Sequence, residues 1–106
     1  MVLHGIDLDS LALRRFCRRW KITEMEVFGS VLRDDFREDS DVDFLVTFDE
    51  GVRWRFREVC DMEEELARIV GRNVDVIERS DLDDPDANPY RRAHIMANKR
   101  RIHVAG

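Results

Sequence analysis

Residues 41–48 read DVDFLVTF, and the alternation within this stretch decides the fold. Its even-numbered residues are all apolar: Val42, Phe44, Val46 and Phe48. Side chains on a β-strand point alternately to the two faces of a sheet, so the pattern predicts a strand whose even positions face a core. Asp41 and Asp43 then share the opposite face, where two carboxylates project side by side from a rigid base.

The sequence around this strand predicts further elements. Apolar spacing indicates a strand over residues 22–28, followed by a short helical turn, and another strand over residues 74–77. Helical periodicity is present over residues 9–21, 53–70 and 89–100. In the middle helix, Phe56 is expected on the apolar stripe and Gly71 is expected to end the helix.

The order strand, long helix, strand is typical of a crossover unit, which joins strands of one sheet. The strands that carry Asp43 and Asp75 are therefore expected to be parallel or near neighbours. We expect an α/β fold with a small mixed sheet of three or four strands. Helices should cover one face of this sheet and the acidic residues should lie open on the other.

Composition narrows the class of protein. The chain has 106 residues, which fits one domain over residues 1–106, and 43% of them are hydrophobic. Its net charge of -5 argues against sequence-independent binding of nucleic acid, which is not expected as a direct ligand. Cys17 and Cys60 have no second cysteine or histidine at metal-ligand spacing, which favours a reducing cytoplasm. No segment has the length of apolar sequence that a membrane span needs.

An Asp-x-Asp pattern has little weight alone, because in this acidic chain it recurs at Asp7/Asp9, Asp81/Asp83 and Asp84/Asp86. Only Asp41 and Asp43 lie on a convincing strand. Two buried carboxylates on one face repel each other, which raises their pKa values and destabilises the fold unless a cation is present. Mg²⁺ suits such a place because it prefers carboxylates, waters and phosphate oxygens. Asp75 on an adjacent strand would complete a site for two ions about 4 Å apart.

Gly29-Ser30 supplies a candidate phosphate site. A glycine lets the backbone approach a phosphate closely, and Ser30 can donate its hydroxyl at the start of the helical turn. By itself, Gly-Ser after a strand is typical of a tight turn with a cap. Ten residues separate it from Asp41 and a further aspartate, Asp75, lies on a later strand, which favours the phosphate interpretation.

The remaining candidate residues are expected to have structural rather than catalytic roles. The histidines His4, His94 and His103 are scattered without the spacing of metal ligands, and His94 is expected to lie on the last helix without a catalytic role. Trp54, which lies among arginines, is expected to pack or to contact a partner more than to stack on a base.

Gly29-Ser30, ten residues and Asp41-Val42-Asp43 match the signature of the polymerase-beta-like nucleotidyltransferase superfamily. The sequence around both motifs resembles its minimal prokaryotic members, the MNT-domain antitoxins of HEPN/MNT toxin–antitoxin pairs, over residues 26–77. The resemblance implies the minimal form of the nucleotidyltransferase fold and an Mg²⁺-dependent protein adenylyltransferase. Such an enzyme transfers AMP from ATP to a tyrosine hydroxyl of a cognate HEPN ribonuclease toxin, which it silences.

The resemblance also implies roles for individual residues. Gly29 and Ser30 would hold the triphosphate, and Arg33 would contact a phosphate or the partner. The metal ligands would be Asp41 and Asp43, for both Mg²⁺ ions, and Asp75, for one ion while it helps to deprotonate the acceptor. One departure concerns the loop after Arg33, where the family often has Gly-Glu and this chain has two aspartates at residues 34–35.

Two other functions remain open on the sequence. The chain could be a non-catalytic antitoxin that neutralises the toxin by binding alone, although binding does not need a carboxylate triad. It could also be a nucleotidyltransferase that acts on a small molecule or an RNA end, which the acidic charge and the lack of room for a substrate domain disfavour.

Overall fold

The computed structural model describes residues 1–105, and Gly106, the last residue of the expected domain, lies outside the described residues. Over that range the elements follow in the order β1 (Val2–Leu3), β2 (Ile6–Asp7), α1 (Leu11–Arg19), β3 (Ile22–Phe28), η1 (Gly29–Leu32), β4 (Val42–Phe48), α2 (Phe56–Val70), β5 (Val74–Glu78), α3 (Arg79–Leu82), α4 (Pro89–Asn98) and β6 (Arg100–Val104). None of the helices in this range is long and apolar enough to cross a membrane.

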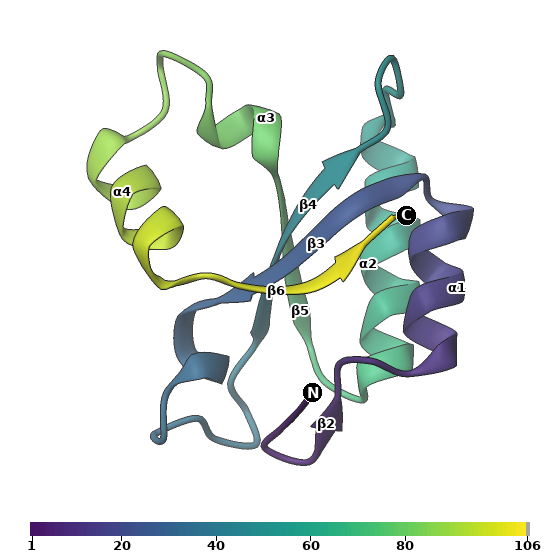
Figure 1. Ribbon diagram of the computed structural model, residues 1–106, viewed down its shortest axis with the longest axis vertical. Helices are drawn as coiled ribbons and strands as arrows, with labels where there is room; N and C mark the ends of the chain where they lie inside the picture. Colours follow the sequence, from purple (N-terminus) through teal and green to yellow (C-terminus); the bar gives the residue numbers. More distant parts are fainter. Residues whose placement is uncertain (106) are drawn as a thin grey trace.

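A four-stranded mixed sheet forms the centre of the fold, with the strand order β5-β4-β3-β6. Strands β4 and β5 are parallel, whereas β3 is antiparallel to both of its neighbours, β4 and β6. Helix α2 makes the crossover from β4 to β5, as the sequence predicts, and Figure 1 shows the sheet between two groups of helices. The α/β class and the small mixed sheet are therefore confirmed.

Helices α1 and α2 pack against one face of the sheet, where the main core lies (Figure 1). The sequence signals at their ends are confirmed: the Ser10 hydroxyl accepts a hydrogen bond from the Leu13 N–H at 3.1 Å, and Gly71 ends α2 with φ of 73°. The fully buried side chains of this core come from both helices and both central strands: Phe16, Met25, Val27, Phe44, Met62 and Leu66.

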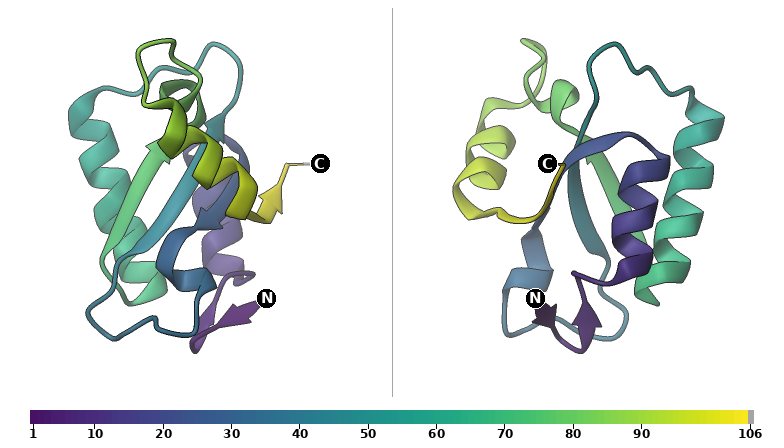
Figure 2. Two further views of the ribbon diagram at one scale, coloured as in Figure 1. Left: turned by 90° about the vertical axis from the view of Figure 1, so that its left-hand side faces the viewer. Right: turned by 45° about the vertical axis from the view of Figure 1, so that its right-hand side comes forward.

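The other face of the sheet is less open than expected. Helix α4 covers part of it, and Figure 2 shows α4 on the opposite side of the sheet from α1 and α2. Ile95 of α4 packs there in a second apolar cluster with Phe28, Leu45 and Leu82. Leu45 explains the difference: it lies on the same face as the aspartates, and an apolar side chain at that position needs a cover of its own.

The start of α2 also differs from the prediction. The helix begins at Phe56, three residues later than expected, and the Phe56 side chain is 84% exposed, so it does not belong to the apolar stripe. Trp54, in the preceding loop, provides the packing instead. Its ring lies 5.2 Å from that of Trp20 and 6.3 Å from that of Phe48, and its Nε1 donates to the Trp20 carbonyl at 3.2 Å.

A buried carboxylate on strand β3 forms ion pairs with the residue after α4 and with the first residue of α3. Glu26 on β3 is only 2% exposed, and its carboxylate pairs with the ammonium of Lys99, the residue between α4 and β6. The Arg79 guanidinium approaches the same carboxylate at 3.9 Å. These contacts hold α4 and the start of α3 against the face that carries the aspartates.

Candidate functional site

Asp43 and Asp75 lie directly opposite each other on the parallel strands β4 and β5. Two residues further along, Leu45 is paired with Ile77, and both belong to the cluster under α4. Because side chains alternate along a strand, Asp43 and Asp75 share that face of the sheet. The structure therefore brings these two predicted residues together. Asp41 lies just before β4 and is exposed.

Gly29 is pressed against the Asp43 carboxylate. It follows β3 directly, and Phe28, the last residue of β3, is paired with Asp43 across the sheet. A Cβ atom built on Gly29 would lie 2.4 Å from Oδ2 of Asp43, and the residue has φ of 75°. Only glycine satisfies both conditions without a shift of the surroundings. The sequence did not predict this approach of the backbone to a carboxylate, and the predicted approach to a phosphate stays a prediction.

Ser30 lies within η1, and Arg33 follows it directly. The Ser30 hydroxyl donates to the Asp41 carbonyl at 3.4 Å, which links η1 to the residue before β4. Arg33 is exposed and its Nε donates to Asp35 at 3.1 Å. All the predicted nucleotide-binding residues thus lie in one turn, next to the carboxylate pair.

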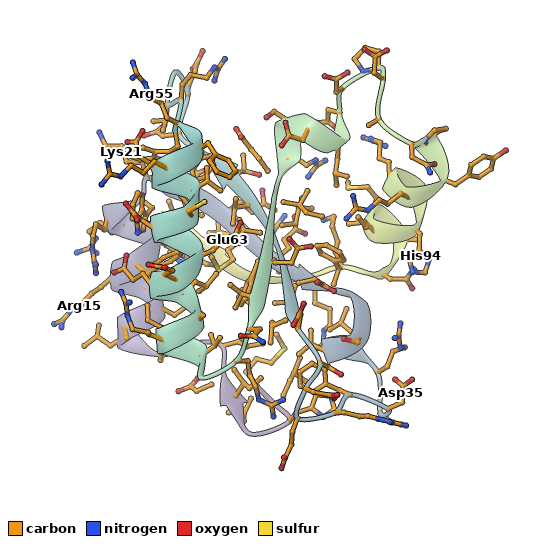
Figure 3. The ribbon with its side chains drawn as sticks, turned by 180° about the vertical axis from the view of Figure 1, so that it is seen from behind. Arg15, Lys21, Asp35, Arg55, Glu63 and His94 are labelled. Carbon is orange, nitrogen blue, oxygen red and sulfur yellow. The ribbon has the colours of Figure 1, made fainter. Side chains whose placement is uncertain are left out.

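The electrostatics of the site centre on Asp43. Burial, and after it the nearby carboxylates of Asp75 and Asp41, raise the pKa of its carboxyl to about 6, while Arg91 and Arg33 act in the opposite direction. Burial, together with Asp75, also raises the pKa of Glu63 on α2, which Figure 3 shows from behind. The site therefore gathers negative charge that a cation would stabilise.

Sequence reasoning missed Arg91. It lies on α4 four residues before Ile95, so the two share one side of the helix, and Ile95 packs against Leu45 beside Asp43. No motif marks the residue. Its four-residue spacing from Ile95 would have indicated Arg91 only if the sequence had shown that α4 covers the second face of the sheet.

The donor set fits one kind of metal site. Within residues 1–105, no three carboxylate, imidazole or thiol side chains converge closely enough to hold an ion between them. A closed site such as that of structural zinc therefore does not fit. Mg²⁺ is commonly held by one or two carboxylates, with waters and substrate phosphates in the remaining positions. The opposed pair of Asp43 and Asp75, with its mutual repulsion, fits this open arrangement.

A cleft of about 160 Å³ lies between η1 and α4 and is lined by Gly29, Leu32, Arg33, His94 and Asn98. Gly29 contacts the Asp43 carboxylate and also lines this cleft, so the two places adjoin. A larger hollow of about 470 Å³ between α1 and β6 contains none of the predicted site residues. We therefore place the candidate site at the smaller cleft, because its chemistry rather than its size marks it.

Comparison with known proteins identifies relatives. The sequence model of the nucleotidyltransferase domain matches residues 10–102. A protein of Methanocaldococcus jannaschii, MJ1379, which is assigned as a protein adenylyltransferase, is 34% identical over 67 residues, or 63% of this chain and 67% of that protein.

Solved structures share the fold. A minimal nucleotidyltransferase is 29% identical and superposes with a TM-score of 0.62, covering 92% of this chain and 97% of that one. A chain of the complex between the tri-AMPylated HEPN toxin of Shewanella oneidensis and its MNT antitoxin is 14% identical, with a TM-score of 0.61, covering 88% of this chain and 67% of that one.

Proposed function

The chain belongs to the nucleotidyltransferase domain family, and on that premise we propose that it is a protein adenylyltransferase that acts as an antitoxin. It transfers AMP from ATP to a tyrosine hydroxyl of a cognate HEPN-type ribonuclease toxin and so neutralises the toxin. The adenylyltransferase assignment of the relative from M. jannaschii and the complex from S. oneidensis support this acceptor class. The proposal includes a single catalytic domain over residues 1–106 that works in the cytoplasm.

One observation carries the proposal: Asp43 and Asp75 oppose each other in register while the Gly29 backbone lies against Asp43. This arrangement lowers the stability of the free protein, because it confines negative charge. A chain that only covered its toxin would gain nothing from it. An enzyme that positions a triphosphate beside a cation needs both halves, the carboxylates and the closely approaching backbone.

In this mechanism the opposed pair of Asp43 and Asp75, with the exposed Asp41 just before β4, would hold two Mg²⁺ ions whose remaining positions waters and phosphate oxygens would fill. Such ions would neutralise the triphosphate and lower the pKa of the attacking hydroxyl. Gly29 and Ser30 hold the triphosphate by close backbone approach and a hydroxyl hydrogen bond. Arg33 binds a phosphate or the partner. The protein thus fixes the α-phosphorus near the carboxylate pair.

The acceptor's phenolic oxygen forms a bond to the α-phosphorus, the bond from that phosphorus to the pyrophosphate oxygen breaks, and pyrophosphate leaves. Asp75 accepts the phenolic proton. It suits this role because it lies on an edge strand and is exposed, so an acceptor on another protein can reach it.

The decisive experiment is a transfer assay with ATP labelled in its α-phosphate, Mg²⁺ and the product of the adjacent gene. We expect label on that partner with the native chain, and none with Asp43→Asn or after EDTA. Asp81→Asn is the matched control, because Asp81 belongs to another Asp-x-Asp pattern and is exposed away from the site. Full transfer by Asp43→Asn would refute the metal assignment.

The same assay separates the other two functions. A tight complex that never acquires label would indicate an antitoxin that acts by binding alone. Label on RNA or on a small molecule, with no partner protein present, would indicate the third function and overturn the proposed acceptor.

A further inference from the structure

The cleft between η1 and α4 has walls of two different origins. Gly29, Leu32 and Arg33 come from the turn that carries the nucleotidyltransferase signature. The opposite wall consists of His94 and Asn98, one helical turn apart on α4, which no sequence motif marks. Figure 3 shows His94 at the end of α4 nearest to the η1 turn.

The polar groups of this cleft are hydrogen-bond donors or can act as donors. No carboxylate lines it, although the chain has 23 acidic residues. Arg33 spends one of its N–H groups on Asp35, which leaves four of the five that a guanidinium carries. A cleft that is lined by a guanidinium, an imidazole and an amide, and by no carboxylate, suits an anion.

Asn98 determines which ring nitrogen of His94 carries the proton. Its Nδ2 donates to the His94 carbonyl at 2.8 Å and lies 3.5 Å from the ring nitrogen Nδ1 of the same residue. An Nδ1 that accepts a hydrogen bond places the ring proton on Nε2. His94 therefore presents its Nε2–H as the donor, and Asn98 acts on a ligand through His94.

The cleft has room for only part of a nucleotide. Sites for whole small molecules usually measure about 300–1,000 Å³, so about 160 Å³ is too little for a nucleoside triphosphate. It corresponds to about five water volumes, which is room for two phosphate groups. Gly29 joins the cleft to Asp43, so a group bound there continues directly from the place of transfer.

We propose that His94 of α4 binds the pyrophosphate portion of the nucleotide from the wall of the cleft opposite Arg33, and that Asn98 positions His94. The inference rests on the proposed function and adds α4 to it. It assigns the second wall of the nucleotide site to a helix outside the signature, and it makes His94 a ligand-binding residue rather than a surface residue of that helix.

The test measures binding rather than activity. We would determine dissociation constants by calorimetry for three probes in the presence of Mg²⁺: AMP-PNP, inorganic pyrophosphate and AMP. His94→Ala should weaken AMP-PNP and pyrophosphate about tenfold, the loss expected for one hydrogen bond to a charged group, and change AMP less than about twofold. His103→Ala is the matched control, because His103 lies on β6 away from the cleft.

Asn98 is tested through its dependence on His94. Asn98→Ala should weaken pyrophosphate binding in the native chain but add nothing to His94→Ala, whereas an independent structural effect would add. Alanine suits a helix, so both variants should fold, which their melting temperatures check.

Two outcomes would overturn the inference while the transfer assay with the native chain stands. Equal losses for AMP and AMP-PNP would place the nucleoside in the cleft, and unchanged constants for all three probes would remove the cleft from the nucleotide site. A native chain that binds no AMP-PNP at all would instead overturn the proposed function, and the inference with it.

Discussion

Replacement of Lys99 by methionine should destabilise the fold strongly. The change removes the ammonium that pairs with Glu26 but keeps a flexible side chain of similar length. The Glu26 carboxylate is 2% exposed, so it would remain buried with only the Arg79 guanidinium, 3.9 Å away. Breaking a buried pair usually costs about 3–5 kcal/mol, and because Arg79 remains we expect about 3 kcal/mol. At roughly 4–8 °C per kcal/mol, the melting temperature should fall by at least 10 °C or so.

Urea denaturation followed by tryptophan fluorescence would measure this effect, because Trp20 and Trp54 report on the core. Glu26→Gln should cost less, about 1–2 kcal/mol, since the Lys99 and Arg79 side chains are 19% and 28% exposed and can reach water. The double variant Glu26→Met with Lys99→Met should recover most of the loss of Lys99→Met alone. A cost below about 1 kcal/mol for Lys99→Met, or additive losses in the double variant, would refute the reasoning.

Three further changes test other features. Gly29→Ala should abolish most transfer, about a hundredfold or more, because its Cβ would displace the Asp43 carboxylate; normal activity would show that the close approach is dispensable. Burial and the neighbouring carboxylates of Asp75 and Asp41 raise the pKa of Asp43 from 3.8 to about 6, so stability present below pH 4 is lost as pH rises through 6. Asp43→Asn should therefore raise stability at pH 7.5 by about 1 kcal/mol, after discounting for solvent screening, but not at pH 4, as melting curves across this range would show. Trp54→Phe should lower stability by about 1 kcal/mol in urea without a change in transfer, because the indole packs and donates a hydrogen bond far from the site.

Much of the fold follows from local patterns in the sequence. The strand over residues 22–28 has the predicted bounds, and the alternation of residues 41–48 gives the correct face for Asp43. The crossover argument correctly places Asp75 next to Asp43, because a helix of that length between two strands leaves few other arrangements. These features depend on residues close together in the chain.

The missed features depend on residues far apart. Strand β6 pairs with β3 across most of the chain, and Arg100 and Arg101 at its start look like an ordinary basic helix end in the sequence. Once β6 is missed, nothing fixes the position of α4, so neither Arg91 nor His94 can be assigned to the site. The first hairpin, β1–β2, was also missed because each of its strands has only two residues.

The opposed aspartates make the loop after α2 intolerant of any change in length. One residue inserted between Gly71 and Val74 would turn Asp75 into the core and turn a valine outward, so the site and the packing would fail together. Two inserted residues would restore the facing but move the carboxylate about 7 Å along its strand, away from Asp43. An insertion of either one or two residues would therefore disrupt the site. Lineages of this fold should therefore vary in the loops around residues 34–40 and 83–88, while the three-residue connection before β5 stays constant in length.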